Sequence, residues 1–227
     1  MPEVLVVARK IAMDFVTHDG TAINVLSSIN CRIREGERIA LVGPSGSGKS
    51  TLVHLLGGLM QPSRGEIIWP ALGNRESLRP SKITFVFQTP SLFPALTAVQ
   101  NVTLPLLLAG DVPDAHSRAI TLLAWFGLDG LADKLPEELS GGQAQRVAMA
   151  RALVVQPRLV LADEPTGQLD GDTSADFLDS VLGIIDGTKT ALLIATHDLS
   201  VARRMKHEWL IEHGNLHSTV DREASYA

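Results

Sequence analysis

The chain has 227 residues, of which 45% are hydrophobic and 20% are charged, as in an ordinary globular protein with room for one large α/β domain. A net charge of −5 without any basic tract excludes a strong general attraction to nucleic acid. Cys31 is the only cysteine, which excludes a disulfide within the chain and favours a reducing compartment.

The N-terminal segment lacks the pattern of a signal peptide. Its apolar run, Val4–Ala8, is short, and no basic stretch precedes it. No apolar run approaches the roughly 20 residues that a membrane-spanning helix needs. We therefore expect no direct membrane insertion, and a membrane function would require a partner that holds the protein there.

The first 35 residues or so alternate β-like runs with polar turns, namely Val4–Ala8 and Asn24–Ile33, which predicts an antiparallel edge sheet. After Glu37 the pattern changes to short, continuous apolar runs. Such runs are typical of strands buried on both faces, as in a parallel sheet covered by helices. The predicted buried strands are Ile39–Val42, Ile83–Phe87, Leu159–Ala162 and Ala191–Ala195.

Between these strands, apolar residues recur with helical spacing. Leu52, Leu55 and Leu56 begin one such series, and Ala115–Phe126 forms another with Gly127 as its expected C-cap. Residues from about 89 to 157 contain no good strand, which predicts an all-helical insertion in an α/β core. We expect one domain over residues 1–227, with a frayed polar end from Ser218 to Ala227.

A phosphate-binding loop follows the first buried strand. The pattern G-x-x-x-x-G-K-[ST] occurs here in full, between a strand and a leucine-periodic helix. A plain glycine- and serine-rich connector would explain the glycines but not the complete pattern in this context. Lys49 is expected to reach the terminal phosphates and Ser50 to bind Mg²⁺. The nucleotide-binding residues expected here are Gly43, Pro44, Ser45, Gly46, Ser47, Gly48, Lys49, Ser50 and Thr51.

Two adjacent carboxylates end the buried strand Leu159–Ala162. Asp163 is placed to hold Mg²⁺ through its water shell. Glu164 is expected to point elsewhere, because successive strand residues face opposite ways, and to polarise the attacking water. Two solvated acids at a strand end are the simpler alternative, but the phosphate-binding loop upstream favours the catalytic interpretation.

Ser140 and Gln143 form the S-x-x-Q pattern of a capping box that begins a helix. Gly141 and Gly142 are unnecessary for a cap and cost about 1 kcal/mol each against alanine in a helical turn. They suggest that something approaches the backbone closely, and a phosphate suits a helix N-terminus. Ser140 is expected both to cap the helix and to contact nucleotide.

At Leu139–Gln143, the pentapeptide LSGGQ, the sequence resembles the ABC ATPase family, and the resemblance covers nearly the whole chain. Gln88 matches the glutamine of the family's Q-loop, and His197 matches its switch histidine. Gly167–Asp170 matches its D-loop. Phe15 stands where the family places an aromatic residue that stacks on adenine, with a plain core phenylalanine as the alternative.

The resemblance implies a RecA-like P-loop NTPase core with an antiparallel β edge subdomain and an inserted helical subdomain. A homodimer or pseudo-dimer would sandwich two ATP molecules, with the loop of one copy facing the LSGGQ segment of the other. The implied catalytic residues are Glu164, His197, Gln88 and Lys49. The implied nucleotide contacts outside the loop are Phe15, Ser140, Gly141, Gly142 and Gln143, and those to Mg²⁺ are Ser50, Gln88 and Asp163.

Within the family, three stretches resemble the branch for lipoprotein release and macrolide or peptide export, at His54–Leu59, Leu161–Gly167 and Thr196–Leu199. Gln168 stands where that branch usually has Asn, and the stretch Arg64–Lys82 is shorter. The implied partners are membrane-spanning permease subunits, at the cytoplasmic face of a bacterial inner membrane. The alternative is a soluble ABC ATPase of iron–sulfur cluster assembly.

The segment Thr89–Leu96 follows Gln88 and contains two prolines and three apolar side chains, Phe93 among them. It predicts either local packing or the groove in which the family receives a short helix of its membrane partner. The other histidines form no metal set: His18, His54, His116, His207, His213 and His217. Gly214-Asn215 between the last two predicts a surface hairpin.

Overall fold

The computed structural model describes residues 1–17, 20–110 and 113–219, so His18 and the polar end after residue 219 lie outside the described residues. The chain divides into two compact units. The phosphate-loop unit comprises Met1–Leu78 and the segment from Ala191 onward. The helical unit comprises Arg79–Thr190.

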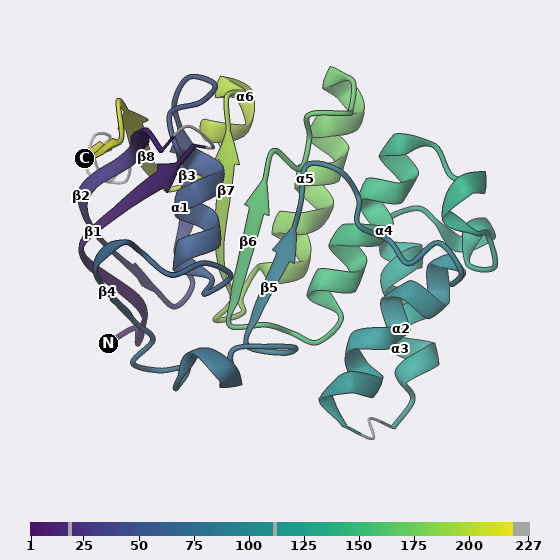
Figure 1. Ribbon diagram of the computed structural model, residues 1–227. Helices are drawn as coiled ribbons and strands as arrows, with labels where there is room; N and C mark the ends of the chain where they lie inside the picture. The colour runs from purple at the N-terminus through teal and green to yellow at the C-terminus, as the bar shows by residue number, and fades with distance from the viewer. Residues whose placement is uncertain (18–19, 111–112, 220–227) are drawn as a thin grey trace, which may run out of the picture. The chain divides into compact units, whose positions relative to one another are not determined.

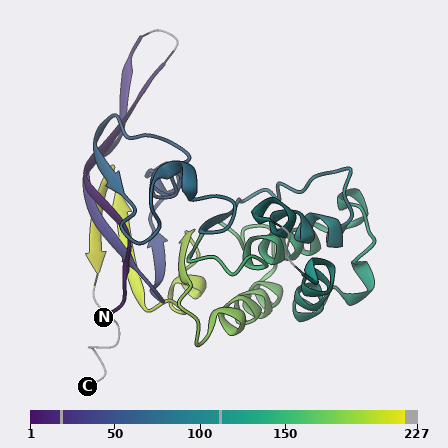
Figure 2. The ribbon, with the colours of Figure 1, turned by 90° about the horizontal axis from the view of Figure 1, so that it is seen from below.

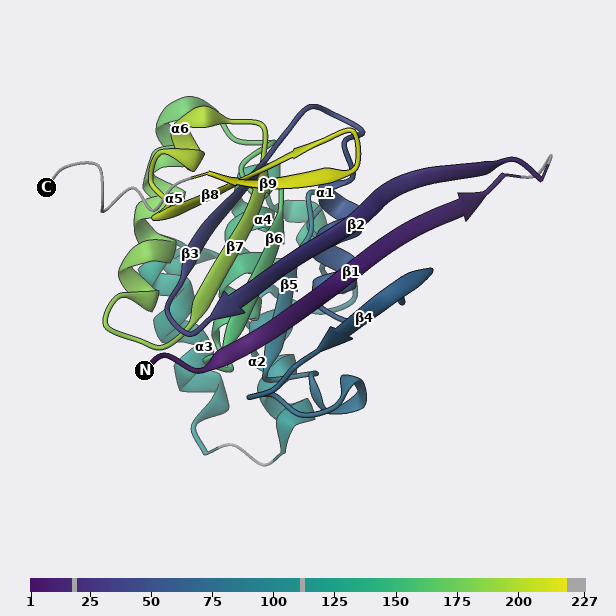
Figure 3. The same cartoon turned by 90° about the vertical axis from the view of Figure 1, so that its left-hand side faces the viewer.

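A three-stranded antiparallel sheet begins the phosphate-loop unit (Figure 3). Its order is β2 (Ala22–Arg34), β1 (Val4–Val16) and β4 (Arg64–Ile68). This confirms the predicted antiparallel sheet, with longer strands than predicted and with β4 in addition. β4 was not predicted because its first half is polar, so apolar residues do not alternate along it. Gly65 of β4 lies so close to β1 that a Cβ there would collide with the backbone of Lys10.

Further strands of this unit follow in the order β7 (Ala191–Thr196), β3 (Arg38–Val42), β8 (His207–Glu212) and β9 (Asn215–Thr219). β3 is parallel to β7 and β8, and β8 is antiparallel to β9. Every residue of β7 is buried, as its unbroken apolar run predicts. His213 and Gly214, with φ of 46° and 72°, form the turn of the predicted hairpin.

The short helices of this unit are α1 (Lys49–Leu56), α6 (Leu199–Ala202) and the 3₁₀ turn η1 (Arg75–Ser77). Leu52, Leu55 and Leu56 of α1 are buried, as their helical spacing predicts. Trp69 Nε1 donates a hydrogen bond to the carbonyl of Leu56 at 2.8 Å, which fixes the end of α1.

In the helical unit, β5 (Ile83–Val86) and β6 (Leu159–Asp163) pair in parallel. The described residues between them form helices and no strand, and these helices lie together (Figures 1 and 2). They are α2 (Ala98–Ala109), α3 (Ala115–Trp125), η2 (Asp129–Leu131), η3 (Pro136–Glu138) and α4 (Gly141–Leu153). α5 (Gly171–Ile185) follows β6.

The end of α3 illustrates how sequence sets these helices. Gly127 adopts a left-handed φ of 69° and its N–H bonds to the carbonyl of Ala124 at 2.8 Å, as the predicted C-cap requires. Trp125 turns toward α5, where its Nε1 donates to the carbonyl of Ser180 at 3.0 Å. The absence of a side chain at Gly183 makes room for the indole ring, which lies 3.3 Å from where a Cβ would stand. Trp125 thus joins the inserted helices to α5.

None of the helices in the described ranges is long and apolar enough to cross a bilayer.

Candidate nucleotide-binding site

The phosphate-binding loop leaves the carboxyl end of β3 and enters α1. Lys49, the first residue of α1, is only 8% exposed. Its Nζ donates hydrogen bonds to the carbonyls of Gly43 at 2.8 Å and Pro44 at 3.1 Å. These bonds hold the ammonium group against the loop that precedes it, where a positive charge and a helix N-terminus together suit phosphate oxygens.

Glycines give the loop its path. Gly48 caps α1 with a φ of 102°, and a Cβ there would lie 2.7 Å from the Leu26 side chain. Ser47 is buried, and its Oγ has no hydrogen-bond partner among the described residues. The remaining loop residues lie at the surface, where they are accessible to a ligand: Pro44, Ser45, Gly46 and Ser50 are exposed, and Gly43 and Thr51 are half-buried.

His197 lies at the same sheet edge as the loop. Val42 pairs with Thr196 in the parallel register of β3 and β7, so Gly43 and His197 are the next residue on each strand. His197 is exposed. Asp198 caps α6, and hydrogen bonding from Ser200 lowers the pKa of its carboxyl. The predicted placement of His197 beyond its strand is therefore found.

Phe15 lies on β1, opposite Ile23 of β2. Its side chain is 39% exposed, and that of Ile23 is 49% exposed. A core phenylalanine is far more buried than this, so the core alternative is excluded. An exposed aromatic face is free to stack on a planar ligand.

In the helical unit, the carboxyl ends of β5 and β6 meet because Val86 pairs with Ala162. Asp163 is the last residue of β6 and is 8% exposed. Its Oδ1 is buried and has no hydrogen-bond partner within the described ranges. A buried carboxylate oxygen of this kind fits Mg²⁺, which takes one or two carboxylates in addition to phosphates and water.

Glu164 does not continue the strand, contrary to the expectation from strand alternation. Its φ is 47°, in the left-handed region that non-glycine residues rarely occupy. The backbone therefore turns sharply after Asp163, so the alternation of a strand does not extend to Glu164. Such conformations are costly and concentrate at functional sites.

Gln88, Glu164 and Gly167 lie together. A Cβ added to Gly167 would stand 3.9 Å from Gln88 Nε2 and 3.7 Å from Glu164 Cβ. The structure thus brings the side chain of the glutamine after β5 and the residue that follows β6 to the same glycine, at the start of the D-loop segment.

Ser140 begins α4 with the predicted capping box. Its Oγ accepts from the N–H of Gln143 at 3.2 Å, and its own N–H donates to Gln143 Oε1 at 2.9 Å. The side chain of Gln143 is therefore engaged in the cap. Ser140 and Gly141 are exposed at the helix N-terminus.

Side chains of the same chain approach both glycines of the LSGGQ segment. A Cβ on Gly142 would stand 2.8 Å from Leu169 Cδ2, and one on Gly141 would stand 3.3 Å from Gln168 Oε1. The close approach expected from the two glycines is thus already explained in part by the D-loop segment. Gln168 reaches Gly141 with a side chain one methylene longer than Asn.

Sequence reasoning missed Asn101, which is completely buried in α2. Its Oδ1 accepts from the N–H of Phe93, and its Nδ2 donates to the carbonyls of Phe93, Leu96 and Thr97. One side chain thus fixes the segment that follows the Q-loop. The available signal was a polar residue among the apolar residues Val99, Val102 and Leu104 of the predicted helical insertion.

Beside that segment lies a cleft of about 340 Å³. Arg151 of α4 borders it, donating from Nη1 to the carbonyl of Ser91 at 2.7 Å and lying 6.0 Å from the ring centre of Phe93. Burial lowers the pKa of this guanidinium. Phe93 is 52% exposed. Apolar side chains dominate the lining: Phe85, Phe87, Phe93, Leu104 and Leu108.

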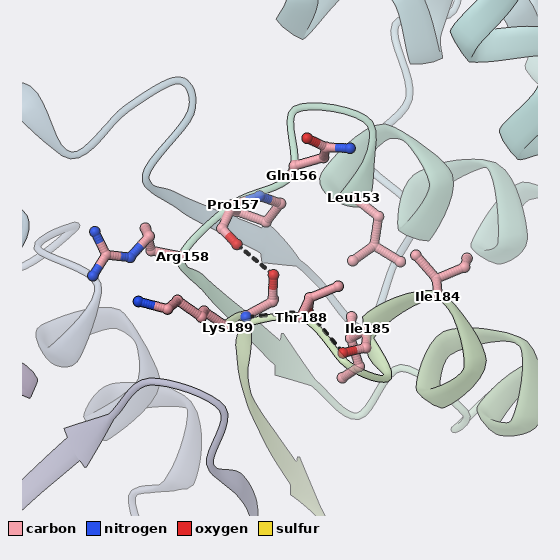
Figure 4. A pocket seen from close by; sticks show the side chains of 9 residues that line it. Leu153, Gln156, Pro157, Arg158, Ile184, Ile185, Thr188 and Lys189 are labelled. Atoms are coloured by element: carbon pink, nitrogen blue, oxygen red, sulfur yellow. Dashed lines mark hydrogen bonds between the residues drawn. The ribbon is translucent and has the colours of Figure 1, made fainter. Parts of the chain in front are cut away.

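A second cavity of about 290 Å³ lies at the opposite end of β6 (Figure 4). Its walls come from the ends of α4 and α5, with Leu153 and Ile185 facing the space. Thr190 Oγ1 bonds to the carbonyl of Pro157 at 2.7 Å and closes one side. It contains none of the predicted site residues, so it is separate from the candidate site.

The sequence profile described as ABC transporter matches residues 26–167. The "Lipoprotein-releasing system ATP-binding protein LolD" of Legionella pneumophila (strain Paris) is 43% identical over 227 residues, covering 96% of this chain and 99% of its own length. The protein of the same name from Pseudomonas syringae pv. tomato is 46% identical over 204 residues, covering 86% and 89%.

Among solved structures, the ATP-binding cassette MJ0796 in a dimeric post-hydrolysis state with ADP and Pi has 34% identity and a TM-score of 0.87, covering 96% of this chain and 99% of its own. cbiO1 from Clostridium perfringens, part of the ABC transporter complex cbiONQ, has 29% identity and a TM-score of 0.81, with 98% and 90% covered. These likenesses confirm the predicted fold class and do not favour the iron–sulfur alternative. The chain is an ATP-hydrolysing, ATP-binding subunit and belongs to the ABC transporter family.

Proposed function

We propose that this chain is the ATPase of a lipoprotein-releasing transporter, that residues 1–227 form one nucleotide-binding domain, and that two copies close around two ATP molecules. The observation that carries the proposal is the complete phosphate-binding loop with the buried ammonium of Lys49 held against it. The names of the relatives support the branch, and the dimeric cassette bound to ADP and Pi supports the two-copy arrangement.

The loop from Gly43 to Thr51 binds the triphosphate through backbone N–H groups and Lys49. Ser50, Asp163 and Gln88 would hold Mg²⁺, and the ion would supply positive charge that offsets the charge of the phosphates. Asp163 suits this role because its buried Oδ1 needs a partner. Phe15 stacks on the adenine with its exposed ring.

Glu164 takes the proton of the attacking water. Asp163 and Glu164 are consecutive residues with a left-handed backbone at Glu164, so one strand end would supply both a metal ligand and a base. Gln88 lies near Glu164 across Gly167 and orients the water and the metal. His197 lies beside the phosphate-binding loop at its sheet edge and hydrogen-bonds the γ-phosphate.

The LSGGQ segment acts on the ATP of the other copy. Ser140 and the N–H groups of Gly141 and Gly142 present a helix N-terminus to its γ-phosphate. Gln143 contributes through the cap that orients Ser140, since its own side chain is engaged there. Closure is required for hydrolysis, because each site needs residues of both copies.

The test of this function is Glu164→Gln, which keeps the shape of the side chain and removes the base. ATP hydrolysis is expected to fall by roughly 100-fold or more, within the usual range for loss of a general base. ATP binding should survive, and ATP should now hold the variant as a dimer in size-exclusion chromatography. Near wild-type turnover by this variant would remove Glu164 from the catalytic role.

Membrane-spanning permease subunits are the proposed partners, and they hold the chain at the cytoplasmic face of the inner membrane. The cleft beside Phe93 is the proposed docking groove, because its lining is apolar and it adjoins Gln88 through the segment Thr89–Leu96. Phe93→Asp is expected to abolish assembly with the permease while ATP binding stays intact. Normal assembly and transport by Phe93→Asp would place the docking site elsewhere.

A further inference from the structure

Gln145 is a buried polar residue of α4 that the mechanism above does not use. It lies five residues after the Ser140 cap, and its side chain is 1% exposed. Its Nε2 donates a hydrogen bond to the main-chain carbonyl of Phe87 at 3.1 Å. β5 pairs with β6 only as far as Val86, so this bond holds the backbone just beyond the end of the ladder.

The orientation of this amide follows from its surroundings. If the nitrogen and oxygen of Gln145 were exchanged, two oxygen acceptors would face each other at the Phe87 carbonyl. Oε1 has no hydrogen-bond partner in the described part of the chain. The bond to Phe87 is therefore the interaction that explains a buried amide inside α4.

The Phe87 carbonyl belongs to the peptide group whose nitrogen is that of Gln88. Because a peptide group is planar, a bond to its carbonyl fixes the plane from which the Gln88 backbone continues. The Gln88 side chain lies against Gly167, near Glu164. The Gln145 amide thus reaches the backbone one peptide group away from Gln88, through the Phe87 carbonyl.

A second bond from α4 reaches the same segment. Arg151 donates from Nη1 to the carbonyl of Ser91 at 2.7 Å. The bonds to Phe87 and Ser91 tie both ends of the segment that carries Gln88 to one rigid helix. The N-terminus of that helix is Ser140, which meets the ATP of the other copy in the proposed dimer.

We propose that Gln145 is a positioning residue, which sets Gln88 through the Phe87–Gln88 peptide and so links the LSGGQ helix to the catalytic edge. The inference rests on the proposed role of Gln88. In the proposed dimer, Ser140 serves one ATP site and Gln88 serves the other. The position of α4 would then set both residues at once.

The test begins with Gln145→Met, which keeps the length of the side chain and removes the donor. The kcat for ATP is expected to fall by about 10- to 100-fold, the range for a slightly misplaced group, while the KM for ATP stays unchanged. Arg146→Met is the matched control, because Arg146 of the same helix donates to the backbone carbonyl of Phe126, at 3.0 Å, away from Gln88. Its kcat should remain at the wild-type value.

Gln145→Asn keeps the amide but shortens the side chain by one methylene, so its kcat should fall as that of Gln145→Met does. This variant replaces Gln145→Met in the test if the methionine variant fails to fold. The decisive comparison is made in a Gln88→Ala background. If Gln145 acts through Gln88, then Gln145→Met causes no further loss there, whereas multiplicative losses would overturn the positioning role.

The two proposals fail differently. A wild-type rate in Gln88→Ala alone would refute the role of Gln88 in the proposed function. A wild-type rate in both folded Gln145 variants beside an impaired Gln88→Ala would refute the positioning role alone.

Discussion

The two units build their parts of the site in different ways. In the phosphate-loop unit, the phosphate-binding loop is built from consecutive residues: β3, the loop and α1 follow one another, and Lys49 bonds to carbonyls five and six residues before it. In the helical unit, residues far apart in the chain must meet. Gln145 holds a carbonyl 58 residues away, and Arg151 holds one 60 residues away.

The difference has a physical cause. A loop that binds phosphate uses backbone N–H groups, whose directions depend on local φ and ψ alone. The segment after β5 lies beyond the ladder of the sheet, so it is held by single side chains at a few carbonyls. The hydrogen bonds of Lys49 in the phosphate-binding loop are therefore local. The segment from Phe87 to Thr97 depends instead on side chains of α2 and α4, namely Asn101, Gln145 and Arg151.

The largest expected effect is the loss of ATP binding when the phosphate-binding loop is changed. Lys49→Ala should abolish measurable ATP binding in calorimetry at physiological ATP concentrations, because the charge aimed at the terminal phosphates is lost. Its thermal stability should change little. Lys134→Ala is the control, since Lys134 forms an exposed i,i+4 pair with Glu138. Wild-type affinity in Lys49→Ala would contradict the assignment of the loop.

Asn101 tests the dependence of the helical unit on single side chains. Asn101→Ala is expected to lower the free energy of unfolding by about 2–4 kcal/mol in urea titrations, because it removes all the hydrogen bonds that this completely buried amide makes to the segment. Thr103→Val in the same helix is the control, since the Thr103 hydroxyl bonds only to the carbonyl of Val99 in its own helix. Equal stabilities of the two variants would show that the segment from Phe93 to Thr97 is held by other contacts.

Phe15 sharpens the comparison within the phosphate-loop unit. Base–aromatic stacking elsewhere contributes about 1–3 kcal/mol, so Phe15→Ala should weaken the binding of ATP by this amount at most. The binding of GTP should weaken equally, because stacking recognises the face of the base and none of its hydrogen-bonding edges. Ile23→Ala removes the exposed cross-strand neighbour and should leave affinity unchanged. A loss of thermal stability in Phe15→Ala without a loss of affinity would make its role structural.

The effect that is absent at neutral pH concerns Cys31 of β2, where burial raises the pKa of the thiol to about 12. Below about pH 8.5 the thiol is protonated in both the folded and the unfolded chain, so it makes no pH-dependent contribution. Between about pH 8.5 and 12, the unfolded chain loses this proton first, and stability should fall. Cys31→Ala should show a shallower decline in alkaline unfolding titrations than the wild type does.

The sequence predicted the local features well. The buried strands, the hairpin at Gly214 and the cap at Ser140 depend on consecutive residues, and each was expected close to where it lies. The strand β4 was missed because half of it is polar. The left-handed φ of Glu164 was missed because strand alternation does not foresee a turn directly after a strand. The bonds of Asn101 and Gln145 join distant segments, which no local pattern encodes.

The joint between Trp125 and α5 has a spectroscopic consequence. The chain has three tryptophans, and Trp69 and Trp209 lie in the phosphate-loop unit. With those two changed to phenylalanine, all indole emission would come from Trp125, whose ring is 57% exposed and whose Nε1 bonds to the carbonyl of Ser180. Indole emission shifts to longer wavelength as its surroundings become more aqueous. Rotation of the inserted helices away from α5 would therefore appear as a red shift, so ATP-driven motion of these helices could be timed by stopped flow without an added label.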